Sequence, residues 1–307
     1  MIPGNPRIGF IGFGEVAYYF AKGLKEDGVL QVSAFDRNAS HAEQGDLVRR
    51  RAADAGVLLV STLRDLVDRS DLIISAVWGN VALDVAKETA SFASAGKVYG
   101  DINNTAPSAK EQGAVLLKEQ GVEFIDMALF TSPSETKHRS PILISGEGAE
   151  SFVKVMSRFG MNLTVVPGPA GKATTIKTLV NIYYKGIQAV CMELALSAWK
   201  AGIDLEILSP LVVKPVENMP REKELPFWMV RGALHAARKA AELESIIKAV
   251  EEWGLKPIML EATRKRLETI SRYDLQGYFK GELAIDNYKA LMEAIDRVGK
   301  KKGIEME

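Results

Sequence analysis

The stretch that decides the fold lies near the start of the chain and reads Ile8-Gly9-Phe10-Ile11-Gly12-Phe13-Gly14-Glu15-Val16-Ala17. Its apolar first half is typical of a buried strand, and its second half opens a helix. Gly12 allows a sharp turn between the two, Gly14 lets a pyrophosphate approach the N–H groups at the helix start, and Ala17 keeps helix and strand in contact. This pattern, G-x-G-x-x-A, predicts a dinucleotide-binding turn. We expect the cofactor to contact Gly12, Phe13, Gly14, Glu15 and Val16.

An acidic residue follows at the distance this motif requires. Asp36 lies 22 residues after Gly14, at the end of the next apolar run. A carboxylate there accepts hydrogen bonds from ribose hydroxyls and repels a 2′-phosphate, which favours NAD over NADP. Arg37 comes next in sequence, and its guanidinium suits a 2′-phosphate. Asp36 and Arg37 are therefore both expected at the cofactor, with NAD preferred and NADP left open.

Apolar runs alternate with helical stretches as far as about Pro167, a pattern typical of βαβ units around a parallel sheet. The chain after Gly168 reads as helical throughout, led by one helix over about 172–201. We therefore predict an α/β fold: a doubly wound Rossmann domain over residues 1–167 and an all-helical substrate and dimerisation domain over 168–307. The expected strands are 7–12, 30–36, 57–60, 72–77, 97–101, 123–126, 142–145 and 163–166.

The composition argues against several functions. The 307 residues carry 39 basic and 39 acidic side chains, so no excess charge favours a nucleic acid or a membrane surface as partner. No apolar run reaches the roughly 18 residues of a membrane span. One cysteine, Cys191, excludes an internal disulfide or a cysteine-based metal site and suits the cytoplasm. The three histidines lie far apart in the sequence, and no metal is expected.

Three further segments carry a family resemblance: the predicted strand from Ser70-Asp71-Leu72 to Val77, the segment Asp101-Ile102-Asn103-Asn104-Thr105-Ala106-Pro107, and the segment Gly171 to Asp204, which contains Lys177 and Asn181. With the glycine turn, they make the chain resemble the β-hydroxyacid dehydrogenases, which include 3-hydroxyisobutyrate, tartronate semialdehyde and phosphogluconate dehydrogenases. The resemblance covers nearly all of the first 205 residues. The family usually has a Ser-Thr pair where this chain has Asn103 and Asn104.

The resemblance implies an NAD(P)-dependent oxidoreductase that acts on a hydroxy acid or the matching carbonyl. Lys177 matches the family's catalytic lysine and is expected to exchange a proton with the substrate hydroxyl, for which its pKa must be lowered. Asn181, four residues on, lies on the same helix face and would orient the substrate. The cofactor is further expected at Val77, Trp78 and Asn103.

Other positions depart from the family pattern. The family's glycine-rich carboxylate-binding loop falls at 126–132, where Phe130 replaces a serine and Thr131 and Ser132 replace two glycines. The charged stretch 137–139 that follows is either an anion-binding loop or a solvated one. Tyr184 occupies the place of the glutamate that phosphogluconate dehydrogenases use, which argues against decarboxylation. The small anionic substrate is expected to contact Asn104, Thr105, Phe130, Thr131, Ser132, Tyr184, His235 and Arg238.

The region from 229 to 253 is expected to form one helix on which Arg231, His235 and Arg238 make a cationic stripe, either at the substrate or solvated. Long helices such as 172–201 commonly pair in the family, so a homodimer is expected. Two other functions stay open. One is an imine or bulky-ketone reductase on the same scaffold, and the other is a non-catalytic dinucleotide sensor.

Overall fold

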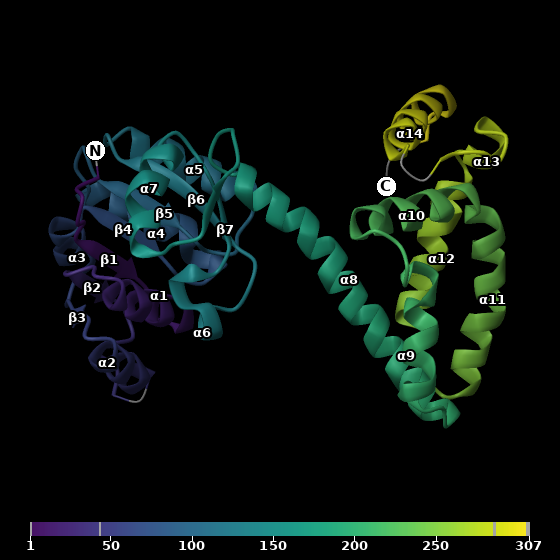
Figure 1. The fold of residues 1–307 in the computed structure, drawn as a ribbon, viewed down its shortest axis with the longest axis horizontal. Coiled ribbons are helices and arrows are strands. Elements are labelled where there is room, and N and C mark those ends of the chain that lie inside the picture. Colours follow the sequence, from purple (N-terminus) through teal and green to yellow (C-terminus); the bar gives the residue numbers. More distant parts are fainter. Residues whose placement is uncertain (1, 43, 285–286, 305–307) are drawn as a thin grey trace. The chain divides into compact units, whose positions relative to one another are not determined.

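The computed structural model describes residues 2–42, 44–284 and 287–304 (Figure 1). The chain divides into two compact units, Met1–Ile182 and Tyr183–Glu307. The division falls within the long helix α8 (Lys172–Ala201), so the first part of α8 belongs to unit 1 and the rest to unit 2. Sequence analysis placed a boundary at 167/168, just before this helix.

Unit 1 is built on one sheet, whose eight strands in the described residues run in the order β3-β2-β1-β4-β5-β6-β7-β8. Neighbouring strands are parallel except for β6 and β7, which are antiparallel. The order reverses between β1 and β4, and ligands of such sheets bind where the carboxyl ends of those strands diverge. The strands are β1 (Ile8–Ile11), β2 (Val32–Phe35), β3 (Leu58–Leu59), β4 (Leu72–Ser75), β5 (Val98–Asp101), β6 (Glu123–Leu129), β7 (Ile142–Ser145) and β8 (Leu163–Val165).

Helices cover both faces of the sheet, and alternate residues of each strand enter two separate cores. On β4, Leu72 and Ile74 join the core beneath α1, α2 and α7, whereas Ile73 joins the core beneath α3, α4 and α5. Both cores are apolar, which explains the continuous apolar runs of the central strands. The helices of unit 1 before α8 are α1 (Glu15–Glu26), α2 (Gln44–Asp54), α3 (Leu63–Arg69), α4 (Ala82–Phe92), α5 (Pro107–Lys118), α6 (Pro133–Thr136) and α7 (Ala149–Met156), with short 3-10 helices η1 (Gly79–Val81), η2 (Lys137–Arg139) and η3 (Ser157–Phe159).

Unit 2 is helical in its described residues, and its core gathers Val230, Leu234, Tyr273, Leu291 and Val298. After α8 come α9 (Leu205–Val213), η4 (Lys214–Val216), α10 (Arg221–Leu234), α11 (Ala236–Glu252), α12 (Ile258–Ser271), α13 (Leu275–Tyr278) and α14 (Tyr288–Lys302). The predicted fold class, a doubly wound sheet followed by helices led by a long one, is confirmed. Each of the eight predicted strands is present, and β6 continues three residues beyond its predicted end, to Leu129.

The single helix predicted over 229–253 is wrong. The chain leaves helical geometry at His235 (φ −111°, ψ 23°), which ends α10 and precedes α11. The change of direction is visible in Figure 1. It has a packing reason, because α10 buries Val230 and Leu234 in the core of unit 2 while α11 packs along α12. Arg231 and Arg238 therefore lie on different helices, and the predicted one-helix cationic stripe does not exist.

Candidate functional site

The glycine turn after β1 has the geometry its sequence predicts. Gly12 has a φ of +80°, and a Cβ atom there would lie 2.6 Å from the carbonyl oxygen of Ala76, so only glycine fits. Gly14 precedes α1, whose first turn has no side-chain cap. A Cβ atom at Gly14 would meet nothing within 4 Å. The turn thus leaves open space beside free N–H groups, which fits the pyrophosphate of a dinucleotide.

Asp36 joins this turn to the end of β2. One carboxylate oxygen accepts the N–H of Phe13 at 2.8 Å, and the other accepts the N–H of Asn38 at 2.9 Å. Each oxygen keeps a lone pair for a further donor, such as a ribose hydroxyl. The neighbouring Arg37 is exposed. Asp36 therefore holds the cofactor turn in place as well as offering acceptor atoms beside it.

Asn103 ties the loops after β4 and β5 together. Its Oδ1 accepts the N–H of Val77 at 2.6 Å, and its Nδ2 donates to Ser75 Oγ at 3.0 Å. The side chain is buried, whereas Asn104 is exposed. Asn103 thus positions Val77 beside the glycine turn, and its own contact with the cofactor stays a prediction. Trp78, the next residue after Val77, is 82% exposed.

A row of buried polar residues crosses four strands at the level where β1, β4 and β5 end. Ser75, Asp101, Asp126 and Ser145 are direct neighbours on β4, β5, β6 and β7. All four are at most 3% exposed. Parallel neighbours in register present their side chains to one face, so Ser75, Asp101 and Asp126 face the layer that holds α5. A helix can be docked on such a row through hydrogen bonds.

Asp126 docks the first turn of α8. Its Oδ2 accepts the N–H groups of Gly171 at 3.0 Å and Thr174 at 2.9 Å, and its Oδ1 accepts the hydroxyl of Thr174 at 2.5 Å. Ser145 Oγ donates to the same carboxylate at 3.1 Å and accepts the N–H of Ala173 at 3.0 Å. A negative charge at a helix N-terminus satisfies otherwise unpaired N–H groups and matches the helix dipole. The start of α8 is thereby bound to the sheet.

Lys110 on α5 completes this network, and sequence analysis missed it. Its Nζ donates to Asp101 Oδ1 at 2.7 Å and to the Asp101 carbonyl oxygen at 2.8 Å, and it lies 3.7 Å from Asp126 Oδ1. The lysine side chain is completely buried. A signal was present in the sequence, because Lys110 shares one face of α5 with Gly113 and Leu117, three and seven residues on. A charged residue in the buried stripe of a helix points to a buried partner.

Lys177 lies one turn beyond Thr174 on α8 and is half-buried. Burial, and then the positive charge of Lys110, lower the pKa of Lys177, while the negative charge of Asp126 opposes them. The lowered pKa increases the fraction of neutral amine that can accept a proton. Asn181 follows four residues later on the same helix face and is also partly buried. Both residues belong to unit 1, the unit that holds the glycine turn.

The remaining predicted substrate residues have varied surroundings. Phe130 is 37% exposed at the end of β6, and Ser132 caps α6 by accepting the N–H of Ser134 at 3.4 Å. Tyr184 is exposed on α8 in unit 2. Arg238 is exposed and forms an ion pair with Glu242 on its own helix.

All three side chains of the charged stretch 137–139 bind the end of α1, and the Arg139 side chain remains 62% exposed. Lys137 pairs with Glu26 at 2.5 Å, and Arg139 pairs with Asp27 at 2.6 Å. His138 is buried, with its Nε2 at 2.8 Å from Asp27 Oδ2. Acidic residues at 26–27 neutralise the stretch, which sequence spacing alone does not reveal.

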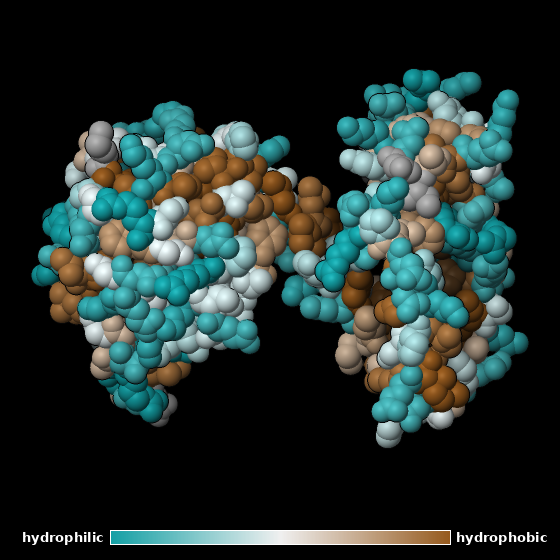
Figure 2. Space-filling model, viewed as in Figure 1, coloured by the Kyte–Doolittle hydropathy of each residue, from teal (hydrophilic) through white to brown (hydrophobic). Residues whose placement is uncertain are grey.

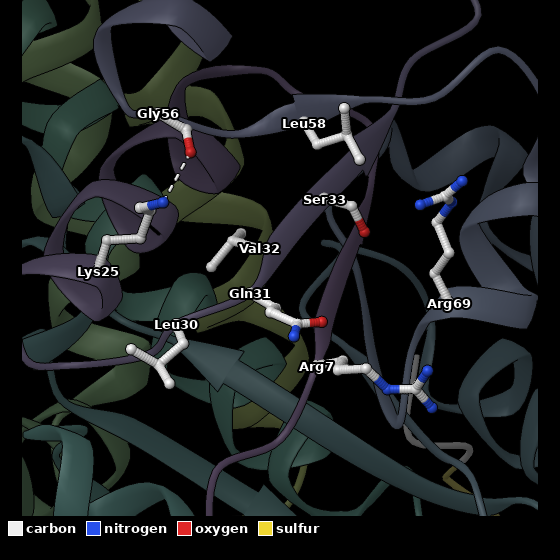
Figure 3. A pocket seen from close by; sticks show the side chains of 9 residues that line it. All are labelled: Arg7, Lys25, Leu30, Gln31, Val32, Ser33, Gly56, Leu58 and Arg69. Atoms are coloured by element: carbon white, nitrogen blue, oxygen red, sulfur yellow. Dashed lines mark hydrogen bonds between the residues drawn. The ribbon is translucent and has the colours of Figure 1, made fainter.

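A cavity of about 420 Å³ lies at the amino ends of β1, β2 and β3 (Figure 3). The glycine turn follows the other, carboxyl end of β1. Two of the cavity's basic residues have partners there: Arg7 pairs with Asp71 at 2.6 Å, and Lys25 donates to the Gly56 carbonyl oxygen at 2.7 Å. It is separate from the glycine turn and Lys177. Within the described ranges, no cluster of three or more His, Cys, Asp or Glu side chains suits a metal ion. The same ranges hold no helix long and apolar enough to span a membrane.

The glycine turn, the acidic residue after β2 and the doubly wound sheet define a dinucleotide-binding domain of the kind found in NAD(P)-dependent oxidoreductases. Residues 7–167 match the NAD binding domain of 6-phosphogluconate dehydrogenase. An uncharacterized 28.5 kDa protein from Methanothermus fervidus is 30% identical over 264 residues, covering 86% of this chain and 98% of that protein. The chain belongs to the β-hydroxyacid dehydrogenase family.

Solved structures agree with this assignment. Conserved protein MTH1747, of unknown function and described as structurally similar to 3-hydroxyacid dehydrogenases, is 28% identical, covers 88% of this chain and 99% of its own, and gives a TM-score of 0.56. A reductive aminase from Aspergillus terreus, solved with NADPH, gives a TM-score of 0.68 at 17% identity and covers 87% of this chain and 94% of its own. At that identity the aminase shows a shared fold alone.

Proposed function

We propose that this protein oxidises a hydroxy acid, or reduces the matching carbonyl compound, with Lys177 as general base and acid. The observation that carries the proposal is the environment of Lys177: a half-buried lysine of lowered pKa, on a helix turn bound to the sheet. A solvated lysine on a helix face would have neither property. Buried lysines with nearby positive charge are common general bases.

In the oxidation direction, the neutral amine of Lys177 accepts the proton of the substrate hydroxyl. A nicotinamide cofactor held at the glycine turn by Gly12, Gly14 and Asp36 would supply the hydride acceptor for the substrate carbon. In reduction, the Lys177 ammonium returns the proton to the carbonyl oxygen. Asn181 orients the substrate oxygen through its side-chain amide, one turn further along α8.

The substrate class is proposed from the loop after β6. Thr131 and Ser132 supply hydroxyl and backbone donors for a carboxylate, in a loop that continues the strand carrying Asp126. Asn104 and Thr105 follow the neighbouring strand β5 and supply further polar contacts. Phe130 replaces a small residue of the family pattern, which favours a substrate other than hydroxyisobutyrate or glycerate.

The test is a screen of hydroxy acids with NAD and NADP, repeated on Lys177→Ala. We expect turnover to fall by about two to four orders of magnitude, as is usual for loss of a general base, while cofactor affinity persists. The matched control is Lys185→Ala, an exposed lysine on the same helix, which should keep wild-type turnover. Near-normal turnover by Lys177→Ala would remove the proposed role.

NAD is the proposed cofactor. Asp36 points its carboxylate to the glycine turn, where a 2′-phosphate would be repelled, whereas the neighbouring Arg37 would attract a 2′-phosphate. The ratio of kcat/KM for NAD to that for NADP measures the preference. We expect a ratio above about ten, equivalent to roughly 1.4 kcal/mol. A ratio below one would show that the protein prefers NADP, with Arg37 as the group that attracts the 2′-phosphate.

A second candidate function is the reduction of imines or bulky ketones, favoured by Phe130 and the missing glycines. The two functions separate by product analysis, because only an imine reductase forms an amine when a ketone and an amine donor are supplied together. A panel in which no hydroxy acid, ketone or imine changes the redox state of the cofactor would instead favour a dinucleotide sensor.

We also propose that the chain acts as a homodimer through α8. An apolar residue recurs every three or four positions along this helix, yet each of them is 37–48% exposed: Tyr183, Ile187, Val190 and Leu194. Figure 2 shows apolar side chains gathered on its surface. An exposed stripe of this spacing suits pairing with a second helix of the same kind.

Light scattering measures the assembly directly. We expect twice the chain mass of 33.5 kDa. Ile187→Glu should yield the monomer, because it places a charge in the stripe. Gln188→Glu, which adds the same charge beside the stripe, is the matched control. A wild-type protein that stays monomeric at micromolar concentration would contradict the proposal.

A further inference from the structure

One completely buried charge in unit 1 takes no direct part in the proton or hydride transfer described above. Lys110 is a lysine with no exposed surface, and burying an ammonium costs several kcal/mol unless hydrogen bonds and opposite charges compensate. Asp101 compensates the buried ammonium through two short hydrogen bonds. An uncharged apolar residue would fill the same space without the cost of burying a charge. A retained buried charge of this kind suggests an electrostatic task.

The contacts of Lys110 lead to the proposed base. Lys110 Nζ lies 3.7 Å from Asp126 Oδ1, and the same oxygen accepts the hydroxyl of Thr174. Thr174 precedes Lys177 by three residues, which is about one helix turn. Two buried groups, one positive and one negative, thus lie next to the turn that presents Lys177.

We propose that Lys110 is a positioning residue for Lys177, holding Asp126 under the first turn of α8 and setting the local charge that Lys177 experiences. This inference rests on the proposed role of Lys177 as the base. Lys110 itself is too deeply buried to reach a substrate and is not a catalytic residue. Its effect runs through Asp126 and through the field of its ammonium.

The charges around Lys177 have opposing effects. The ammonium of Lys110 favours the neutral amine at Lys177, and the carboxylate of Asp126 favours the charged one. Asp101 is bound to Lys110 and reduces the net field of that ammonium. Glu111, next to Lys110 on α5, faces Gly171 at the start of α8, where a Cβ atom would lie 3.1 Å from its carboxylate oxygen. Removing the Lys110 charge leaves an excess of negative charge near Lys177.

Lys110→Met in the full-length protein tests the inference, since methionine fills similar space without charge. The readout is acetylation of the Lys177 amine by acetic anhydride as a function of pH, followed by mass spectrometry of the peptide. We expect the midpoint to move to higher pH by about one unit, the size of effect that a nearby charge produces. The pH profile of kcat should move in the same direction. Lys118→Met, an exposed lysine on the same helix, is the control and should leave both midpoints in place.

Two further variants test the inference in case Lys110→Met does not fold. Lys110→Arg keeps the charge and should keep the wild-type midpoint. Asp101→Asn keeps a hydrogen-bond acceptor for Lys110 but removes the compensating charge, so the Lys177 midpoint should move to lower pH. A folded Lys110→Met with an unchanged midpoint, or an Asp101→Asn midpoint that stays or rises, would overturn the inference.

The labelling result is independent of turnover. If Lys177→Ala keeps its activity, the proposed chemistry fails even when the acetylation midpoint responds to Lys110. If Lys177→Ala is inactive but the acetylation midpoint of Lys177 does not change in Lys110→Met, the proposed role of Lys177 is supported and the positioning role of Lys110 is wrong.

Discussion

Replacing Asp126 by alanine should detach the first turn of α8 from the sheet. The carboxylate accepts hydrogen bonds from Ser145 Oγ, Gly171 N, Thr174 N and Thr174 Oγ1, and it faces Lys110. All of these groups are shielded from water, so the variant leaves donors without an acceptor and a buried ammonium with one carboxylate instead of two. Water cannot replace the lost partners without opening the packed layer between α5 and the sheet.

The magnitude follows from what is left behind. Breaking a buried charge pair by removing one partner costs about 3–5 kcal/mol. Lys110 keeps Asp101, so we expect a value near the lower end, about 3 kcal/mol. In a unit of this size each kcal/mol lowers the melting temperature by roughly 2–4 °C, which gives a fall of about 6–12 °C. Asp126→Asn, which keeps one acceptor oxygen, should lose about half as much.

Differential scanning calorimetry of the full chain measures the loss, with Asp68→Ala as an exposed control that should stay within about 0.5 kcal/mol of wild type. Amide hydrogen exchange gives a local readout, because the N–H groups of Gly171 and Thr174 should exchange faster in Asp126→Ala. Turnover should fall as well, since the turn before Lys177 loses its support. A fall in melting temperature below about 2 °C with unchanged exchange at these amides would refute the reasoning.

Three further outcomes are expected. Gly14→Ala should leave the melting temperature of the free protein unchanged and weaken NAD binding at least about tenfold in calorimetric titration, because its Cβ atom enters open space that the pyrophosphate needs. Gly12→Ala should weaken NAD binding and also lower the stability of the free protein by about 1–3 kcal/mol, because φ at Gly12 is +80° and the Ala76 carbonyl leaves no room for a Cβ atom. A Gly12→Ala variant of wild-type stability would contradict this reason. The hydrogen bond from Arg139, more than that from His138, lowers the pKa of Asp27, so the stabilisation it gives is complete above the unfolded pKa of about 3.9 and disappears as the pH falls through the lower folded value. The melting-temperature difference between wild type and Asp27→Asn should thus be present at pH 7 and vanish in acid, and a constant difference would disprove the assignment.

Local sequence signals account for the fold and the cofactor turn. Each central strand is a short apolar run, and the glycines at 12 and 14 have roles that depend on backbone geometry within a few residues. Asp36 was also predictable, because its distance from the turn is set by one intervening helix and strand. Its hydrogen bond to the N–H of Phe13 shows that the two signals describe one structure.

Long-range neighbours account for what sequence analysis missed. Asp101, Lys110 and Asp126 come from β5, α5 and β6, and only the sheet register brings the two carboxylates together. The break at His235 has no proline to mark it. It arises because α10 packs on α13 and α14 in the core of unit 2 whereas α11 packs mainly along α12. The ion pairs of 137–139 join positions more than a hundred residues apart in the sequence. Local sequence patterns cannot predict pairs of that separation.

The attachment of α8 to the sheet has a consequence for how such an enzyme changes over time. Asp126, Thr174, the proposed base Lys177 and the glycine turn all belong to unit 1, so one compact unit holds them all. Substitutions in residues 183–304 fall outside that unit. Substitutions can therefore accumulate in the helical unit by gradual drift without altering the residues that attach the turn before Lys177 to the sheet.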